Sequence, residues 1–94
     1  MTRTLSVTQQ GVMLRLAEGE QLIFDWHITR FCMGAPANPW NTISSATVRA
    51  LLNLKFIEQD PDPVYALRGI GYRLRSEGRD WIAMARRSSS QIPG

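Results

Sequence analysis

Residues 43–54 read Ile-Ser-Ser-Ala-Thr-Val-Arg-Ala-Leu-Leu-Asn-Leu, and this stretch carries the strongest helical pattern in the chain. At 100° per residue, one side of a helix over residues 44–54 is mostly apolar, with Thr47, Val48, Leu51, Leu52 and Leu54 on it. The opposite side carries Ala46, Arg49, Ala50 and Asn53. Ser44 is placed to accept a hydrogen bond from the free amides of the first turn. The stretch therefore predicts a capped helix whose outward side combines small residues with one arginine and one asparagine.

The sequence that follows this helix predicts a turn, a β-hairpin and a last helix. Pro61 and Pro63 force a turn. Residues 64–67 and 72–75 are β-like runs, and the segment 68–71 between them holds two glycines, as expected for a hairpin. Alternation along the second strand places Arg73 and Arg75 on one side. Residues 76–87 predict the last helix, and residues 88–94 are expected to form a disordered tail.

The sequence before the central helix predicts one helix, a strand region and a loop. Residues 7–18 have apolar side chains at helical spacing, and Gly19 suits a helix C-terminus. Residues 21–31 are apolar and β-prone without a helical stripe, so we expect strand there. Gly34, Pro36 and Pro39 exclude a regular helix from residues 34–40, which we expect to be a loop with Trp40 away from the deep core. We expect residues 1–87 to form a single domain, because the length leaves no room for a second core.

Three stretches of this sequence resemble a winged helix-turn-helix domain of small bacterial and phage regulators. Residues 43–52 are similar to the start of a recognition helix, residues 65–74 resemble a wing hairpin, and residues 72–79 resemble the junction after the wing. The resemblance implies an α+β winged-helix fold with three main helices, a strand region after the first helix and a C-terminal wing hairpin. It further implies sequence-specific binding of double-stranded DNA by a cytoplasmic transcription regulator, acting as a homodimer.

The outward side of the central helix supplies side chains that suit a DNA major groove. Ala46 and Ala50 permit close approach, Arg49 can bind guanine, and Asn53 can pair with adenine. Ser45, near the helix N-terminus, can meet a phosphate together with backbone amides. The competing interpretation is that these residues are the ordinary polar side of an amphipathic helix.

The predicted hairpin offers a second set of DNA contacts. Arg68 is expected at its tip, with Arg73 and Arg75 on its open face, where all three can hold phosphates. DNA binding then requires these arginines to face the same direction as the outward side of the helix over residues 44–54. Replacing Arg73 is then expected to weaken binding to every DNA sequence alike. The competing interpretation is that arginines on edge strands discourage aggregation between sheets.

Two departures from the winged-helix pattern favour a different class of function. The short helix that normally precedes the recognition helix is replaced by the Pro-rich segment 34–40, and Lys55 stands where glycine is frequent. The alternative is a winged-helix module that binds a protein, such as a phage-encoded inhibitor or adaptor of a host protein. Its sequence support also includes the acidic turn at Asp60 and Asp62, and Trp40, whose exposure would indicate a protein contact.

Composition narrows the remaining function classes. The net charge is +3, and the whole excess lies in residues 48–94, which carry eight basic and five acidic side chains. One histidine (His27) and one cysteine (Cys32) are too few for a metal site or a recognisable catalytic set, so we expect no enzyme, cofactor or metal. A single cysteine forms no internal disulfide, and the sequence shows no membrane span, which together fit a cytoplasmic protein.

Overall fold

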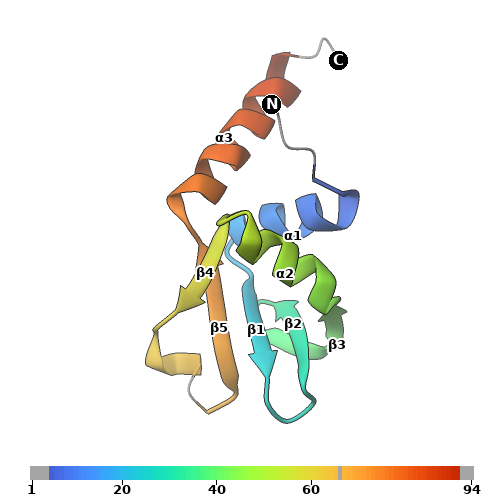
Figure 1. Cartoon of the computed structure of the whole chain (residues 1–94), viewed down its shortest axis with the longest axis vertical. Coiled ribbons are helices and arrows are strands. Elements are labelled where there is room, and N and C mark those ends of the chain that lie inside the picture. The colour runs from blue at the N-terminus through green and yellow to red at the C-terminus, as the bar shows by residue number, and fades with distance from the viewer. Residues whose placement is uncertain (1–4, 66, 92–94) are drawn as a thin grey trace.

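The structure is a computed structural model that describes residues 5–65 and 67–91. It is an α+β fold in which helices lie against a five-stranded antiparallel sheet with strand order β3-β2-β1-β5-β4 (Figure 1). The strands are β1 (Gln21–Asp25), β2 (Arg30–Gly34), β3 (Ala37–Ile43), β4 (Ile57–Asp60) and β5 (Gly69–Leu74). The helices are α1 (Val7–Ala17), α2 (Ser45–Asn53) and α3 (Ser76–Gln91), together with a 3-10 turn, η1 (Pro63–Tyr65).

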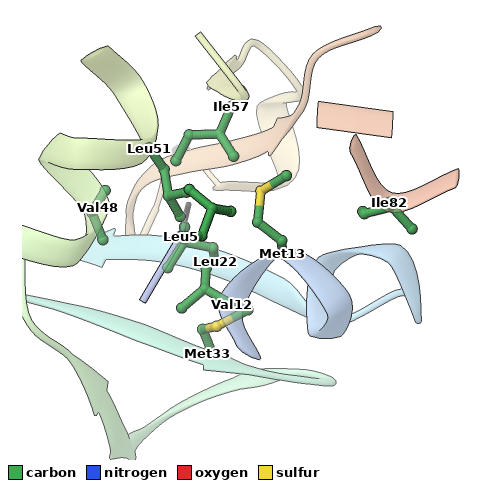
Figure 2. Packing of buried hydrophobic residues seen from close by; sticks show 9 residues of the cluster. All are labelled: Leu5, Val12, Met13, Leu22, Met33, Val48, Leu51, Ile57 and Ile82. Carbon is green, nitrogen blue, oxygen red and sulfur yellow. The ribbon is translucent and has the colours of Figure 1, made fainter. Parts of the chain in front are cut away.

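The main core forms where α1 and α2 pack on one face of the sheet. Alternation along β1 and β2 sends Leu22 and Met33 toward the helices, which contribute Val12, Met13, Val48 and Leu51 (Figure 2). Leu5, Ile57 and Ile82 complete the cluster of buried side chains. Because α2 turns Thr47, Val48 and Leu51 into this core, its other side must face solvent.

The opposite face of the sheet carries a smaller apolar cluster, covered by the chain between β4 and β5. Ile23, Cys32 and Ala37 are buried there, and Tyr65 of η1 packs against them. A Cβ atom on Gly71 would overlap the Tyr65 ring, so only glycine lets the ring sit on β5. This face of the sheet is therefore covered by the segment that contains η1 and not by an α-helix.

The predicted helices are confirmed with small changes at their ends. The first helix begins at Val7, with Ser6 as its N-cap in a capping box with Gln9, and it ends at Ala17. The central helix has Ser44 as its N-cap, as expected. The last helix continues to Gln91 and so includes residues 88–91 of the segment expected to be a disordered tail. Residues 92–94 of that segment lie outside the described residues.

Two predictions for the strands are wrong. Residues 34–40, expected to be a loop, form a tight turn with a cis Ala35–Pro36 peptide bond and the first half of β3. Pro39 is tolerated because β3 is an edge strand, where a missing N–H breaks no necessary ladder bond. The strand expected over residues 64–67 does not form at the described positions, since residues 64 and 65 belong to η1, Leu67 lies in a turn, and β5 pairs instead with β4 and β1. Ala66 lies outside the described residues. The two glycines expected in the hairpin turn, Gly69 and Gly71, lie within β5.

Candidate nucleic-acid interface

Helix α2 presents the predicted outward stripe to solvent. The Ser44 side chain accepts a hydrogen bond from the Ala46 backbone N–H at 3.2 Å and so fixes the start of the helix. Ala46, Arg49 and Asn53 are exposed, and Ala50 is half-buried. Ser45 is exposed in the first turn. The structure therefore brings five of the predicted site residues onto one accessible side of a single helix.

The segment that contains α2 is free of acidic residues. From Trp26 to Ile57 the chain contains no aspartate or glutamate, while it contains Arg30, Arg49 and Lys55. All three cations are exposed, and none makes an ion pair within residues 5–65 and 67–91. Their positive charge is therefore not cancelled by a bound carboxylate from these residues.

Arg30 is a functional candidate that does not emerge from the sequence patterns above. It starts β2 and, with Thr29, Thr42 and Ser45, lines a shallow hollow of about 280 Å³ beside the N-terminus of α2. The hollow thus combines a guanidinium group, hydroxyl groups and the positive end of a helix dipole. The signal that identifies Arg30 from sequence is the absence of acids between residues 26 and 57, which a charge count by halves conceals.

Arg68 is bound within the molecule and does not stand at a hairpin tip. One terminal guanidinium nitrogen donates to the Ala37 carbonyl at 2.7 Å, and the other lies 3.3 Å from a carboxylate oxygen of Asp25. The Asp25 carboxylate is buried and also accepts a hydrogen bond from the His27 backbone N–H at 2.8 Å. That backbone hydrogen bond, together with Arg68, holds the pKa of Asp25 below its ordinary value. Arg68 therefore fastens the segment before β5 to β1 and β3.

Arg73 and Arg75 are engaged by carboxylates. Arg73 lies opposite Glu58 in the β4–β5 ladder, its Nε donates to Glu58 at 2.8 Å, and Asp60 lies 3.9 Å away. Arg75 lies 3.7 Å from Glu58 and 3.5 Å from Glu77. The acids of the hairpin and of the start of α3 thus engage the guanidinium groups that were predicted to hold DNA phosphates. As a result, β4 and β5 present little net charge.

The helix stripe and the hairpin arginines lie on different sides of the sheet. Tyr72 and Leu74 of β5 pack against the core under the helices, so alternation sends Arg73 to the opposite face. The α2 stripe lies opposite the buried Thr47, Val48 and Leu51, so it faces away from the sheet on the side that α2 covers. The expectation that the helix stripe and the hairpin arginines face the same direction is therefore wrong, and they do not form one basic surface.

The only histidine of the sequence lies in an exposed turn, and the only cysteine is buried. His27 lies in the turn between β1 and β2, with its Nδ1 3.3 Å from Asp25. Cys32 is buried, and burial raises the pKa of its thiol. Within the described part of the chain, no three His, Cys, Asp or Glu side chains gather in a way that could hold a metal ion. Nor does any described helix have the length and apolar character needed to cross a bilayer.

Trp40 is the most exposed large apolar side chain among the described residues, at 92% of its full accessible surface. It lies on the edge strand β3, so the expectation that Trp40 stays out of the deep core is confirmed. Exposed tryptophan is enriched at protein contacts.

Comparison of this chain with protein-family models, with curated proteins and with solved structures gave no match.

Proposed function

We propose that this protein binds double-stranded DNA in a sequence-specific manner, with α2 in the major groove. The observation that carries the proposal is the solvent-facing side of α2, whose arginine and asparagine lie within residues 26–57, a stretch without a single acid. A polyanion meets no repulsive carboxylate from this stretch. The proposal places the protein among winged-helix regulators.

The order of the elements supports this relationship. The strands β1, β5 and β4 form a three-stranded antiparallel unit, and α2 directly precedes its β4–β5 hairpin, as a recognition helix precedes a wing (Figure 1). The β2–β3 hairpin takes the chain position of the short bracing helix. In this arrangement β2 and the edge strand β3 brace the start of α2, because β3 leads into the helix with only Ser44 between them.

Each residue of the interface has a chemical role in the proposal. Arg49 donates to guanine O6 and N7, and Asn53 pairs with the adenine edge, while Ala46 and Ala50 allow the helix backbone to approach the bases. Ser45 and Arg30 bind phosphate at the helix N-terminus, and Lys55 binds phosphate beyond its C-terminus. The hairpin arginines Arg73 and Arg75 are excluded from this interface, because their own carboxylate partners neutralise them.

Selection from a library of random duplexes tests the base-reading role of Arg49. The native protein is expected to enrich a defined site, and Arg49→Ala is expected to lose about 1 to 3 kcal/mol of discrimination at one base pair. Arg79→Ala is the control, since it removes another exposed arginine, on α3. An equal loss of affinity on every duplex from Arg49→Ala would refute base reading.

A second candidate function, binding of another protein, is favoured by the exposure of Trp40. Trp40 is almost fully exposed on an open sheet edge, and tryptophan is among the side chains that contribute most to binding at protein interfaces. A photo-crosslinking amino acid at position 40, compared with the same group at the exposed Met84, tests this candidate. A single partner captured from position 40 alone supports it, and identical capture from both positions refutes it.

A further inference from the structure

A groove of about 600 Å³ opens beside α3, away from the stripe on α2. It forms where β1 has its last pair with β5, at Leu22 and Tyr72, while β5 continues to Leu74. The end of α1 and the turn before β1 form one wall, and α3 forms another. The volume lies within the range of small-molecule sites in proteins.

Part of the lining of this groove is apolar. Leu16 and Ala17 come from α1, Leu74 from β5, and Ile82 and Ala83 from α3. Tyr65 and Tyr72 also line the groove, and their hydroxyl groups can donate hydrogen bonds at neutral pH because the ordinary pKa of tyrosine is about 10. Burial raises the pKa of both phenols further. A ligand with an apolar body would therefore gain free energy from leaving water here.

Two arginines on the wall of the groove are not engaged by the acids of the described chain. Arg79 and Arg86 are seven residues apart on α3, which places their Cα atoms on the same side of the helix and about 10 Å apart. Neither makes an ion pair with another described residue. The acids that line the groove are already engaged: Glu20 holds Arg15 at 2.9 Å, and Asp60 faces Arg73 and accepts the Asp62 backbone N–H at 3.0 Å. The uncompensated charge of the groove is therefore positive.

We propose that this groove binds an organic acid, in which a carboxylate on an aromatic or aliphatic body meets Arg79 and Arg86 while the body covers Leu16, Leu74 and Ile82. The guanidinium groups supply paired donors for the carboxylate. The apolar part of the lining favours a ligand with an apolar body over a small hydrophilic anion. This inference stands on the α1, β5 and α3 residues alone and does not depend on DNA binding by α2.

An NMR titration of the uniformly ¹⁵N-labelled full chain with 4-phenylbutyrate tests the site. We expect saturable shifts of the amides of Ala17, Leu74 and Ala83, which line the groove. The double variant Arg79→Gln/Arg86→Gln is expected to bind about tenfold more weakly, because two charge-assisted hydrogen bonds are lost. The neutral analogue 4-phenyl-1-butanol is expected to lose affinity on the native protein to a similar extent.

The variant Arg49→Gln is the matched control, since it removes one exposed arginine from α2 and leaves the groove intact. It should bind 4-phenylbutyrate with native affinity. Unchanged affinity in the double variant, equal binding of the alcohol, or shifts scattered over the molecule would each overturn the proposal. Amide spectra of the free variants, which should match the native spectrum outside α3, show that any loss is not caused by unfolding.

Discussion

At some positions of this chain only glycine fits, because another segment lies too close for a Cβ atom. The sequence does not show which segments those are. Gly69 and Gly71 predict a turn by composition, yet both lie within β5. A Cβ on Gly69 would overlap the Phe24 carbonyl oxygen, and one on Gly71 would enter the Tyr65 ring. Glycine is required there by close approach of other segments, which only the tertiary structure reveals.

Replacing Gly71 by alanine should therefore destabilise the fold. The new methyl group displaces the Tyr65 ring, and overpacking of this kind costs about 1 to 3 kcal/mol. Gly11→Ala is the matched control, because Gly11 lies inside α1 and an added methyl group there would meet no atom within 4 Å, so the change should stabilise by about 0.5 to 1 kcal/mol. Urea unfolding measures both effects, and equal midpoints for the two variants would contradict the placement of Tyr65.

The lowered pKa of Asp25 predicts that the stability of the fold depends on pH. Hydrogen bonding to the His27 N–H and to Arg68 lowers the pKa of Asp25 in the folded state below its ordinary value of 3.8. The ionised carboxylate therefore contributes its full stabilisation above the unfolded pKa, and this contribution is lost as the pH falls through the lower folded pKa. The gap in unfolding free energy between the native protein and Asp25→Asn should be constant near neutral pH and should shrink below about pH 4. A gap that stays constant into strong acid would show that Asp25 does not act through its charge.

At the scale of elements, the helices follow from the sequence more closely than the strands do. The apolar spacing and Ser44 identify α2 nearly to the residue, because a helix is stabilised by contacts within a few positions. The partners of a strand lie far along the chain, so the sequence does not predict β4 and pairs β5 with the wrong segment. The predicted site residues on α2 lie on its outward side, as predicted. The ion pairs of Arg68, Arg73 and Arg75 were not predicted, because their acids come from other elements.

The ion pairs of the β4–β5 hairpin predict how removal of the Glu58 charge changes the affinity for DNA. Glu58 engages both Arg73 and Arg75, so Glu58→Gln should remove one carboxylate partner from each guanidinium group and leave Asp60 beside Arg73 and Glu77 beside Arg75. Non-specific affinity for DNA should then rise and its salt dependence should steepen, since less restrained arginines can bind phosphates and release their counterions. Electrophoretic mobility shifts on random duplex DNA measure the change, with Glu18→Gln as a control that removes an exposed acid at the end of α1. Equal gains from both variants would show that the hairpin arginines were not restrained by Glu58.

Across the described part of the molecule, cations without an ion pair gather at two places on different elements. Arg30 begins β2 near the N-terminus of α2, Arg49 lies on α2 and Lys55 follows its C-terminus, whereas Arg79 and Arg86 lie on α3 beside the groove. Arg68 and Arg73, by contrast, are held in internal ion pairs at the sheet. The small net charge of +3 thus hides an uneven distribution, and the proposed functions rest on where the free positive charge lies.

The most direct test of DNA binding through α2 compares the affinity of duplex DNA for the native protein and for the double variant Arg30→Gln/Arg49→Gln. Fluorescence anisotropy measures both affinities at about 50 and about 200 mM salt. We predict that the native protein binds at the lower salt concentration and weakens steeply at the higher one. The double variant should bind weakly at both concentrations, with a shallower salt dependence. Absence of binding by the native protein at low salt, or native affinity in the double variant, would contradict a DNA-binding surface on α2.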